Sequence, residues 1–388
     1  MVYTLIKRIQ LPEYVTRHAR NLVRMSFPTE KMFQNSAPIF NLGKDKKNSR
    51  IIKEYIRKYE MGLTSLRKEN GAFIAAPSND YSACWLRDQL YANFAYLFLG
   101  DTQKFREGVW VAFDILHKHS KKIEKAIMNP PCETKHFIHA KYNTDNFNEI
   151  TDDWGHHQLD AIGLFLFMVS LAHKRNVGIF RNGKDLDLLQ LLVSYLIAVR
   201  YWDAPDNGMW EEGMDLHASS IGACVAGLSL VQKEELAVVP DALIYEGAEA
   251  LYRLLPNETP SRDVDMAQLS LIWPYRVVSD DLAEHIVRRI EEKLIQKKGL
   301  NRYWDDNYYR SQNGISGEWT MGFFWLSLIE NARGNKKKAE MWFKRGTATE
   351  TQEGMLPELY CDGKPNGNTP LAWSHSMAII AGLSFVNS

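Results

Sequence analysis

The chain has 388 residues, of which 45% are hydrophobic and 12% aromatic, enough to form the core of one large domain or two ordinary ones. Lysine plus arginine equals aspartate plus glutamate at 47 each, so no net charge attracts the protein to nucleic acid or to an anionic membrane surface. Its 4 cysteines lie far apart and form no CxxC pair, which predicts reduced thiols instead of a disulfide framework. We therefore expect a partner that is small or uncharged.

The first fifty residues are irregular, with prolines at 12, 28 and 38 and a polar stretch that ends in NLGKDKKNSR. We interpret residues 1–50 as an arm packed on the main domain, or as part of a dimer contact, and residues 51–388 as that domain. No segment reaches the about 20 apolar residues of a membrane span, and the N-terminus lacks a secretory pattern. We expect a cytoplasmic monomer or homodimer with neither a membrane nor a nucleic-acid partner.

From about residue 52 onward, apolar residues recur at the spacing of three and four that is typical of helices. In chain order, this pattern covers residues 90–100, 159–175, 186–202, 219–233 and 320–335. Alternating strand patterns are scarce, and no glycine-rich turn follows a credible strand. The sequence therefore predicts an all-α fold without a dinucleotide site or a P-loop.

Polar, tryptophan-rich loops separate the helices, and most of them lie about 50 to 70 residues apart. They end near Trp85, Trp154, Glu211, Asp265, Trp319 and Trp373. Each interval holds roughly two helices, so the chain could form an open solenoid or a closed double ring. The loops differ from one another and carry Trp, Arg, Asp and Glu, which favours a closed ring with one composite site at its mouth.

Two acidic loops stand out from the rest. Residues 206–212, DNGMWEE, place Glu211 and Glu212 after a turn and a tryptophan; taken alone, they fit acids at a helix N-terminus. Glu358 lies between leucines in LPEL, where a carboxylate is unfavourable unless it is used. Two carboxylates on separate loops of one mouth are what glycoside hydrolysis requires: a protonated acid, and a base or nucleophile.

Side chains suited to binding a sugar accompany these acids. Flat apolar faces are offered by Trp85, Trp154, Trp210, Trp319 and Trp373, and hydrogen-bonding groups by Arg87, Asp88, Asp160 and Arg302. Taken singly, Arg87 and Asp88 fit an ordinary ion pair at a helix start, and Trp319 or Trp325 fits a core position. The histidines show no metal-ligand spacing. We expect no metal and no cofactor.

Five motifs occur in an order that is more specific than any one of them. They are YSACWLRD (81–88), WGHHQLD (154–160), DNGMWEE (206–212), NRYWDDNY with GEWT (301–308 and 317–320), and LPELY with PLAWSHS (356–360 and 370–376). Together they resemble the motifs of glucoamylases and their relatives, glycoside hydrolase family 15, over roughly residues 81–380. The resemblance implies an (α/α)6 barrel, here without a β-sandwich or a starch-binding module.

The resemblance also implies a role for each matching residue. Glu211 corresponds to the general acid, Glu212 to a substrate-binding carboxylate, and Glu358 to the general base that activates water and inverts the anomeric carbon. Arg87 and Asp88 correspond to the pair that grips the terminal sugar, which implies exo-action. The other matches are Tyr81 near the catalytic water, Trp154 stacking at the first subsite, Arg302 holding hydroxyls, and Trp373 as a wall of the pocket.

We therefore predict an inverting, exo-acting α-glucosidase for short oligosaccharides such as the maltose or isomaltose series. Glu211 should be protonated, beside Trp210 and near Glu212, whereas Glu358 should be ionised near solvent. Their carboxyl groups should lie roughly 6.5 to 9.5 Å apart. Two alternatives stay open: a disaccharide phosphorylase on the same barrel, and a non-catalytic sugar-sensing domain like that in the large subunits of phosphorylase kinase.

Overall fold

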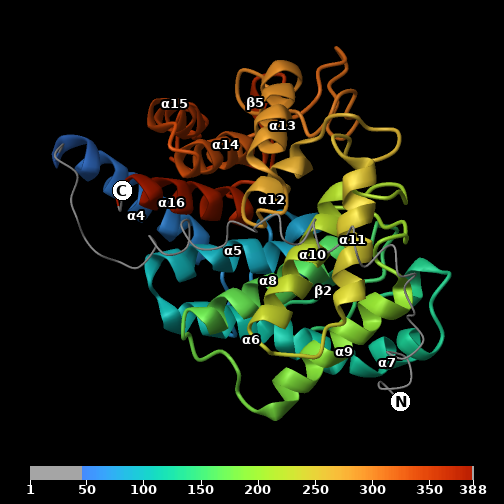
Figure 1. Ribbon diagram of the computed structural model, residues 1–388. Coiled ribbons are helices and arrows are strands. Elements are labelled where there is room, and N and C mark those ends of the chain that lie inside the picture. Colours follow the sequence, from blue (N-terminus) through green and yellow to red (C-terminus); the bar gives the residue numbers. More distant parts are fainter. Residues whose placement is uncertain (1–45, 387–388) are drawn as a thin grey trace.

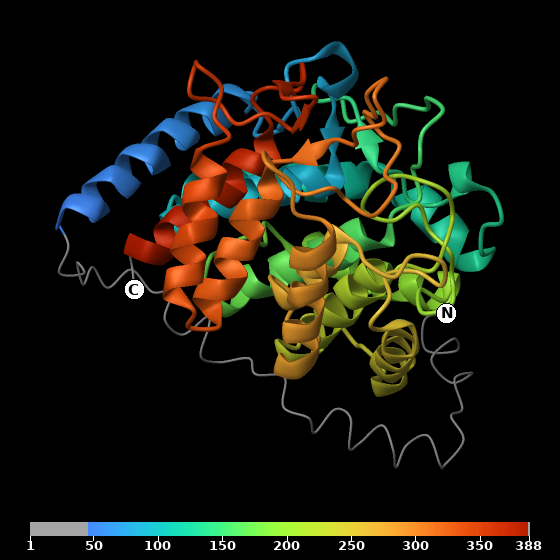
Figure 2. The same cartoon turned by 90° about the horizontal axis from the view of Figure 1, so that it is seen from above.

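The structure, a computed structural model, describes residues 46–386 (Figure 1). The predicted arm of residues 1–50 therefore lies almost entirely outside the described residues. The first described element, α4 (Lys46–Ser65), runs through residue 50, where the arm was expected to end. Figure 2 shows this long blue helix beside the red C-terminal helix α16, with which it is in contact.

The helices alternate along the chain between an outer and an inner ring. The inner helices are α5 (Leu86–Leu99), α8 (Leu159–Lys174), α10 (Ala218–Lys233), α12 (Leu269–Ile272), α14 (Met321–Ala332) and α16 (Ala372–Val386). The outer helices are α4, α6 (Thr102–Lys118) with α7 (Ser120–Met128), α9 (Gly183–Val199), α11 (Asp241–Leu254), α13 (Asp280–Lys293) and α15 (Lys336–Thr347). Each inner helix contacts the next, and α16 contacts α5, which closes the ring. The predicted all-α (α/α)6 barrel is thus confirmed.

The position of each helix explains its composition. Inner helices have neighbours on every side, so α8 is buried without interruption from Leu159 to Ala172. Outer helices cover the inner ring with one face only. In α13 the buried residues, Ala283, Ile286, Val287 and Ile290, follow the spacing of three and four that one helical face requires.

Short strands and 3₁₀ turns occupy the loops before the inner helices. Strand β1 (Cys84–Trp85) pairs with β2 (Lys141–Tyr142), and β3 (Glu318–Trp319) pairs with β4 (Leu359–Cys361), which pairs with β5 (Lys364–Pro365), all antiparallel. The 3₁₀ turns are η1 (Asn79–Tyr81), η2 (Thr134–His136) and η3 (Met266–Gln268). The β3–β4 register sets Trp319 opposite Leu359, next to Glu358. These small sheets therefore bring distant loops together at one end of the barrel.

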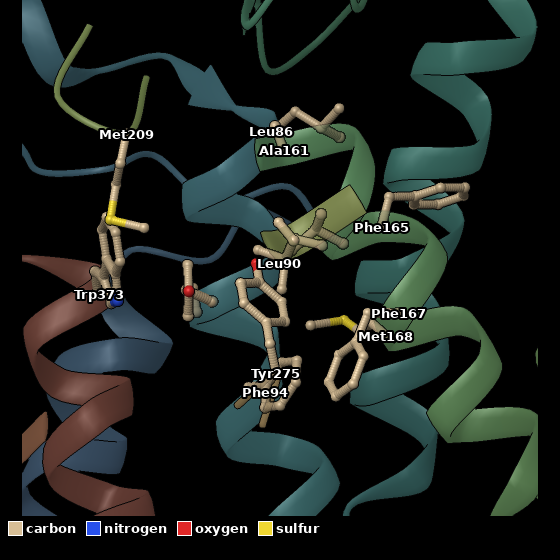
Figure 3. Packing of buried hydrophobic residues seen from close by; sticks show 14 of the residues in the cluster. Leu86, Leu90, Phe94, Ala161, Phe165, Phe167, Met168, Met209, Tyr275 and Trp373 are labelled. Atoms are coloured by element: carbon tan, nitrogen blue, oxygen red, sulfur yellow. The ribbon is translucent and has the colours of Figure 1, made fainter. Parts of the chain in front are cut away.

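Large side chains fill the barrel below that end. Figure 3 shows Leu90 and Phe94 of α5 and Phe165 and Met168 of α8 among the buried residues. Trp373, at the start of α16, stacks its ring on that of Tyr91 in α5, with centroids 4.3 Å apart. The interior is a packed core that closes the barrel beneath its loops.

Glycines allow α8 and α10 to approach closely. A Cβ on Gly163 would lie 2.4 Å from the backbone nitrogen of Cys224, and one on Gly227 would lie 2.5 Å from the carbonyl oxygen of Gly163. No side chain fits either gap without moving backbone atoms. These two positions set the spacing between the most extensively paired inner helices.

We therefore expect Gly163→Ala to lower the free energy of unfolding by about 1–3 kcal/mol, because the added methyl group forces the two helices apart. Urea unfolding followed by circular dichroism would measure the change as a lower midpoint at an unchanged slope. The control is Gly183→Ala, at the start of α9, where a Cβ meets no atom within 4 Å. Equal midpoints for the two variants would contradict this account of the packing.

Candidate active site

A cavity of about 460 Å³ opens where the loops before the inner helices converge. Its wall includes every predicted site residue except Asp160: Tyr81, Trp85, Arg87, Asp88, Trp154, Trp210, Glu211, Glu212, Arg302, Trp319, Glu358 and Trp373. The cavity lies at the N-terminal ends of the inner helices, because the residues of the wall precede or begin those helices. Partial positive charge at helix N-termini favours the carboxylates gathered there.

Arg87, the second residue of α5, is buried at the centre of this wall. Its Nη2 lies 2.7 Å from Glu211 Oε1 and 3.5 Å from Asp88 Oδ2, and its Nη1 donates to Gln158 Oε1 at 2.7 Å. Burial raises the pKa of Asp88 to about 7, although Arg87 acts in the opposite direction. A carboxyl group that titrates near neutrality can both donate to a sugar hydroxyl and accept from one.

Asp160 does not line the cavity. It is buried at the second position of α8, where Oδ2 lies 3.9 Å from Arg87 Nη1. Burial raises its pKa to about 6, and Arg87 opposes that shift. The prediction that Asp160 contacts the sugar is therefore not supported, because the residue lies behind Arg87.

The loop that carries Glu211 is held by buried hydrogen bonds. The Asp206 carboxylate accepts from the backbone N–H of Leu159 and from Ser220 Oγ, both at 2.8 Å, and lies 2.9 Å from His217 Nδ1. Glu211 itself has a φ of 63°, in the left-handed region that non-glycine residues seldom adopt. The loop thus fixes an unusual backbone conformation that turns Glu211 toward the cavity.

Both oxygens of the Glu211 carboxylate accept hydrogen bonds. Oε1 accepts from Arg87, and Oε2 accepts from the indole N–H of Trp154. The side chain of Glu211 is 9% exposed. A proton on either oxygen requires one of these contacts to open, and Trp154, which is 37% exposed, is far more accessible than the buried Arg87.

The prediction that Glu358 lies near solvent is wrong, because its side chain is buried. It is 2% exposed, and its Oε2 accepts from Asn366 Nδ2 at 2.6 Å and Asn368 Nδ2 at 2.7 Å. Burial raises the pKa of Glu358, whereas the two amides act to lower it. The carboxylate is stabilised by the protein's own donors instead of by bulk water.

Glu212 forms the centre of a second charged network. Its Oε1 accepts from Arg302 Nη2 at 3.0 Å and from the Tyr303 hydroxyl at 2.7 Å, and its Oε2 accepts from Arg262 Nη2 at 2.8 Å. Arg302 also binds both oxygens of Asp306, at 2.8 and 2.7 Å. Glu212 and Arg302 are therefore held by the protein itself before any sugar arrives.

Aromatic rings form much of the remaining wall. Trp210 lies with its ring centroid 5.8 Å from that of Trp319 and 6.4 Å from that of Trp373, and its indole N–H donates to Asp265 at 2.8 Å. Tyr308 stacks on Trp319 with centroids 6.1 Å apart. These flat faces suit the C–H surfaces of a hexose.

Several site residues escaped the sequence analysis. They are Asn207, Met209 and Tyr308 on the wall, and Arg262, Tyr303, Asp306, Asn366 and Asn368 behind it. Tyr308, whose hydroxyl lies 2.9 Å from that of Tyr81, ends the motif NRYWDDNY and could have been found there. The two asparagines carry no such signal, because only the fold brings them to Glu358.

Within residues 46–386, no group of three or more His, Cys, Asp or Glu side chains is arranged to hold a metal ion. The helices of this part of the chain are also too short or too polar to cross a membrane.

The barrel and its carboxylate-lined, tryptophan-walled cavity define the fold of a glycoside hydrolase. The sequence model of Glycosyl hydrolases family 15 matches residues 55–316, and the chain belongs to this family. Its structure is similar to a "Glycosidase Wild Type" with a TM-score of 0.75 at 22% identity, covering 87% of this chain and 98% of that one. It is also similar to a bacterial glucoamylase complexed with acarbose, with a TM-score of 0.64 at 17% identity over 86% of this chain and 55% of that one.

The chain is also similar in sequence to regulatory subunits of a kinase. The chain is 25% identical over 413 residues to the phosphorylase b kinase regulatory subunit alpha, liver isoform, of Mus musculus. The match covers 86% of this chain and 32% of the relative, so this chain spans about a third of that protein's length. The chain is thus similar in structure to glycosidases and in sequence to a regulatory subunit of a kinase.

The buried pair of His217 and Asp206 makes stability depend on pH. Burial would lower the pKa of His217, but Asp206 raises it from 6.5 to about 9. This contribution is therefore complete below pH 6.5 and is lost as the pH rises through 9, up to about 3 kcal/mol in all. Unfolding by urea between pH 6 and 9.5 should show that loss in the wild type and a flatter profile in His217→Gln.

The exposed His136, replaced by glutamine, is the control for this series. It should reproduce the wild-type profile. An unchanged slope in His217→Gln would mean that the pair does not carry the dependence.

Proposed function

We propose that the protein is an inverting, exo-acting α-glucosidase that releases glucose from the non-reducing end of short α-glucosides. The observation that carries the proposal is that Glu211 and Glu358, from loops far apart in the sequence, line one cavity of about 460 Å³. Membership of a glycoside hydrolase family supports it.

In this mechanism the two carboxyl groups act on opposite faces of the sugar. Glu211 donates its proton to the glycosidic oxygen as the bond from that oxygen to the anomeric carbon breaks. Glu358 takes a proton from water as the water oxygen bonds to that carbon. Glu211 ends as a carboxylate and Glu358 as a carboxylic acid, and solvent restores both.

Contacts on the two carboxylates support this division of roles. Glu358 accepts two amide hydrogen bonds on one oxygen, which favours the unprotonated form that a base requires. Glu211 contacts Trp154 at the exposed side of the cavity, where an incoming sugar can displace the indole and free Oε2 for a proton. Arg87 and Asp88 at the buried side would hold the terminal sugar and block a longer chain from passing, which favours exo-action.

We expect Glu211→Gln and Glu358→Gln each to lower kcat by about 10²- to 10⁴-fold with little change in KM, because an amide can neither deliver nor accept the proton. The assay is glucose release from maltose, isomaltose and their longer homologues. Proton NMR should show the β anomer appearing first from an α-glucoside. Glu353→Gln, exposed and five residues before the proposed base, is the matched control and should retain wild-type activity.

Early release of the α anomer, or full activity in Glu211→Gln, would contradict the proposed mechanism. Activity that requires added inorganic phosphate would instead identify a disaccharide phosphorylase.

The second candidate is a non-catalytic sugar-binding module of a larger regulatory protein. Similarity to a phosphorylase kinase regulatory subunit favours it, as do the protein contacts that already occupy Glu212 and Arg302. Calorimetric titration with glucose and maltose separates the two. Saturable binding without turnover in any assay would favour the regulatory module, and turnover would favour the enzyme.

A further inference from the structure

The hairpin that carries Glu358 also carries the side chains that hold it. Glu358 precedes β4, and the chain returns through β5 so that the Glu358 N–H donates to the carbonyl oxygen of Asn368 at 3.0 Å. The Asn366 N–H donates to the carbonyl oxygen of Leu359 at 3.1 Å. The backbone ladder thus fixes both asparagines beside the Glu358 carboxylate.

Both amides donate to the same carboxylate oxygen, Oε2. Asn368 is buried, and its carbonyl oxygen accepts a hydrogen bond from the hydroxyl of Ser78, on the loop before η1. Since the carbonyl end of the amide is occupied by a donor, its NH₂ end must face Glu358. This orientation suits an unprotonated Oε2, because a proton there would meet the amide hydrogens.

Other polar groups near Glu358 do not produce this asymmetry. The titratable and charged groups that face it are Tyr81, Asp88, Arg302, Tyr308 and Tyr309. Arg302 favours the charged form, and Asp88 and Glu358 disfavour each other's charge. The tyrosines are neutral at neutral pH, because the pKa of each is raised. The Tyr81 hydroxyl also hydrogen-bonds to the Glu358 carboxylate and acts to lower its pKa. Among the described residues, Asn366 and Asn368 are the pair that donates to one and the same oxygen, Oε2.

We propose that Asn366 and Asn368, with Ser78 orienting Asn368, are positioning residues that fix Oε2 of Glu358 and leave Oε1 as the oxygen that accepts the proton from water. This inference rests on the proposed role of Glu358 as the base. The amides offset the burial of the charge without competing for the proton. They therefore set the pH below which the base stops working.

The test is Asn368→Asp, which keeps the shape of the side chain but replaces a donor with a second carboxylate. Two carboxyl groups in contact cannot both be ionised easily. The acid limb of kcat/KM should therefore move to higher pH by about one unit or more. KM at the new optimum should stay within about twofold, because the change acts on the base and not on sugar binding.

Two further variants keep the proposal testable if Asn368→Asp does not fold. Asn366→Ala, at a partly exposed position, should move the acid limb in the same direction. Ser78→Ala should move it less, because the amide loses only its orienting partner.

Asp362→Asn is the matched control. It changes a charge at the exposed tip of the same hairpin, and asparagine tolerates the φ of 51° found there. Its acid limb should equal that of the wild type. An unmoved acid limb in Asn368→Asp and Asn366→Ala would overturn the proposal, as would an equal shift in Asp362→Asn.

A titration that needs no turnover separates this inference from the proposed function. Carbon-13 NMR of labelled glutamate carboxyls, with Glu358 assigned through Glu358→Gln, should show a higher midpoint for Glu358 in Asn368→Asp than in the wild type. If the wild type hydrolyses no glucoside but the midpoint of Glu358 moves, the proposed hydrolysis fails and the positioning of Glu358 by the two asparagines is supported. If glucose is released but neither the midpoint nor the acid limb moves, the positioning role of the two asparagines is refuted and the proposed hydrolysis is not.

Discussion

The buried guanidinium of Arg87 is the interaction on which the cavity depends. It joins α5 to Gln158 before α8 and to Glu211 before α10, and its guanidinium carbon lies 5.6 Å from the ring centroid of Trp373 in α16. Burying a cation is unfavourable unless carboxylates surround it, and those carboxylates are equally unfavourable without the cation. Arg87 and the loops before α8 and α10 therefore stabilise one another, and the ring of helices brings them together.

The two proposed catalytic carboxylates differ in what stabilises them. Glu211 lies against a permanent cation and an exposed indole, whereas Glu358 lies in a buried position against neutral amides. A cation holds a charge strongly and over a longer range, whereas neutral donors act only at contact distance. The site therefore treats two identical side chains differently, and unequal roles follow from their surroundings.

The chain is similar both to glycosidases and to a kinase regulatory subunit, and fold alone does not decide the chemistry. In this chain the charged networks around Arg87 and Arg302 would also serve sugar binding without turnover. The proposed hydrolysis also needs the second carboxylate, Glu358, which has its own donors on a hairpin that contributes little else to the cavity.

The ring of helices and most of the residues of the cavity wall could be predicted from the sequence alone. The spacing of apolar residues shows whether a helix is buried on all sides or on one side, so the helices can be predicted from short segments. The order of the motifs places tryptophans and acids before successive inner helices, so most residues of the cavity wall can be predicted in the same way. The sequence did not predict that Asp160 is buried against Arg87 or that Glu358 is buried. Nor did it predict that Arg262 donates to Glu212, or that Asn366 and Asn368 donate to Glu358. The burial of a side chain and the donors that contact it depend on which loops meet at the cavity. Those loops lie far apart in the sequence, so local patterns do not reveal them.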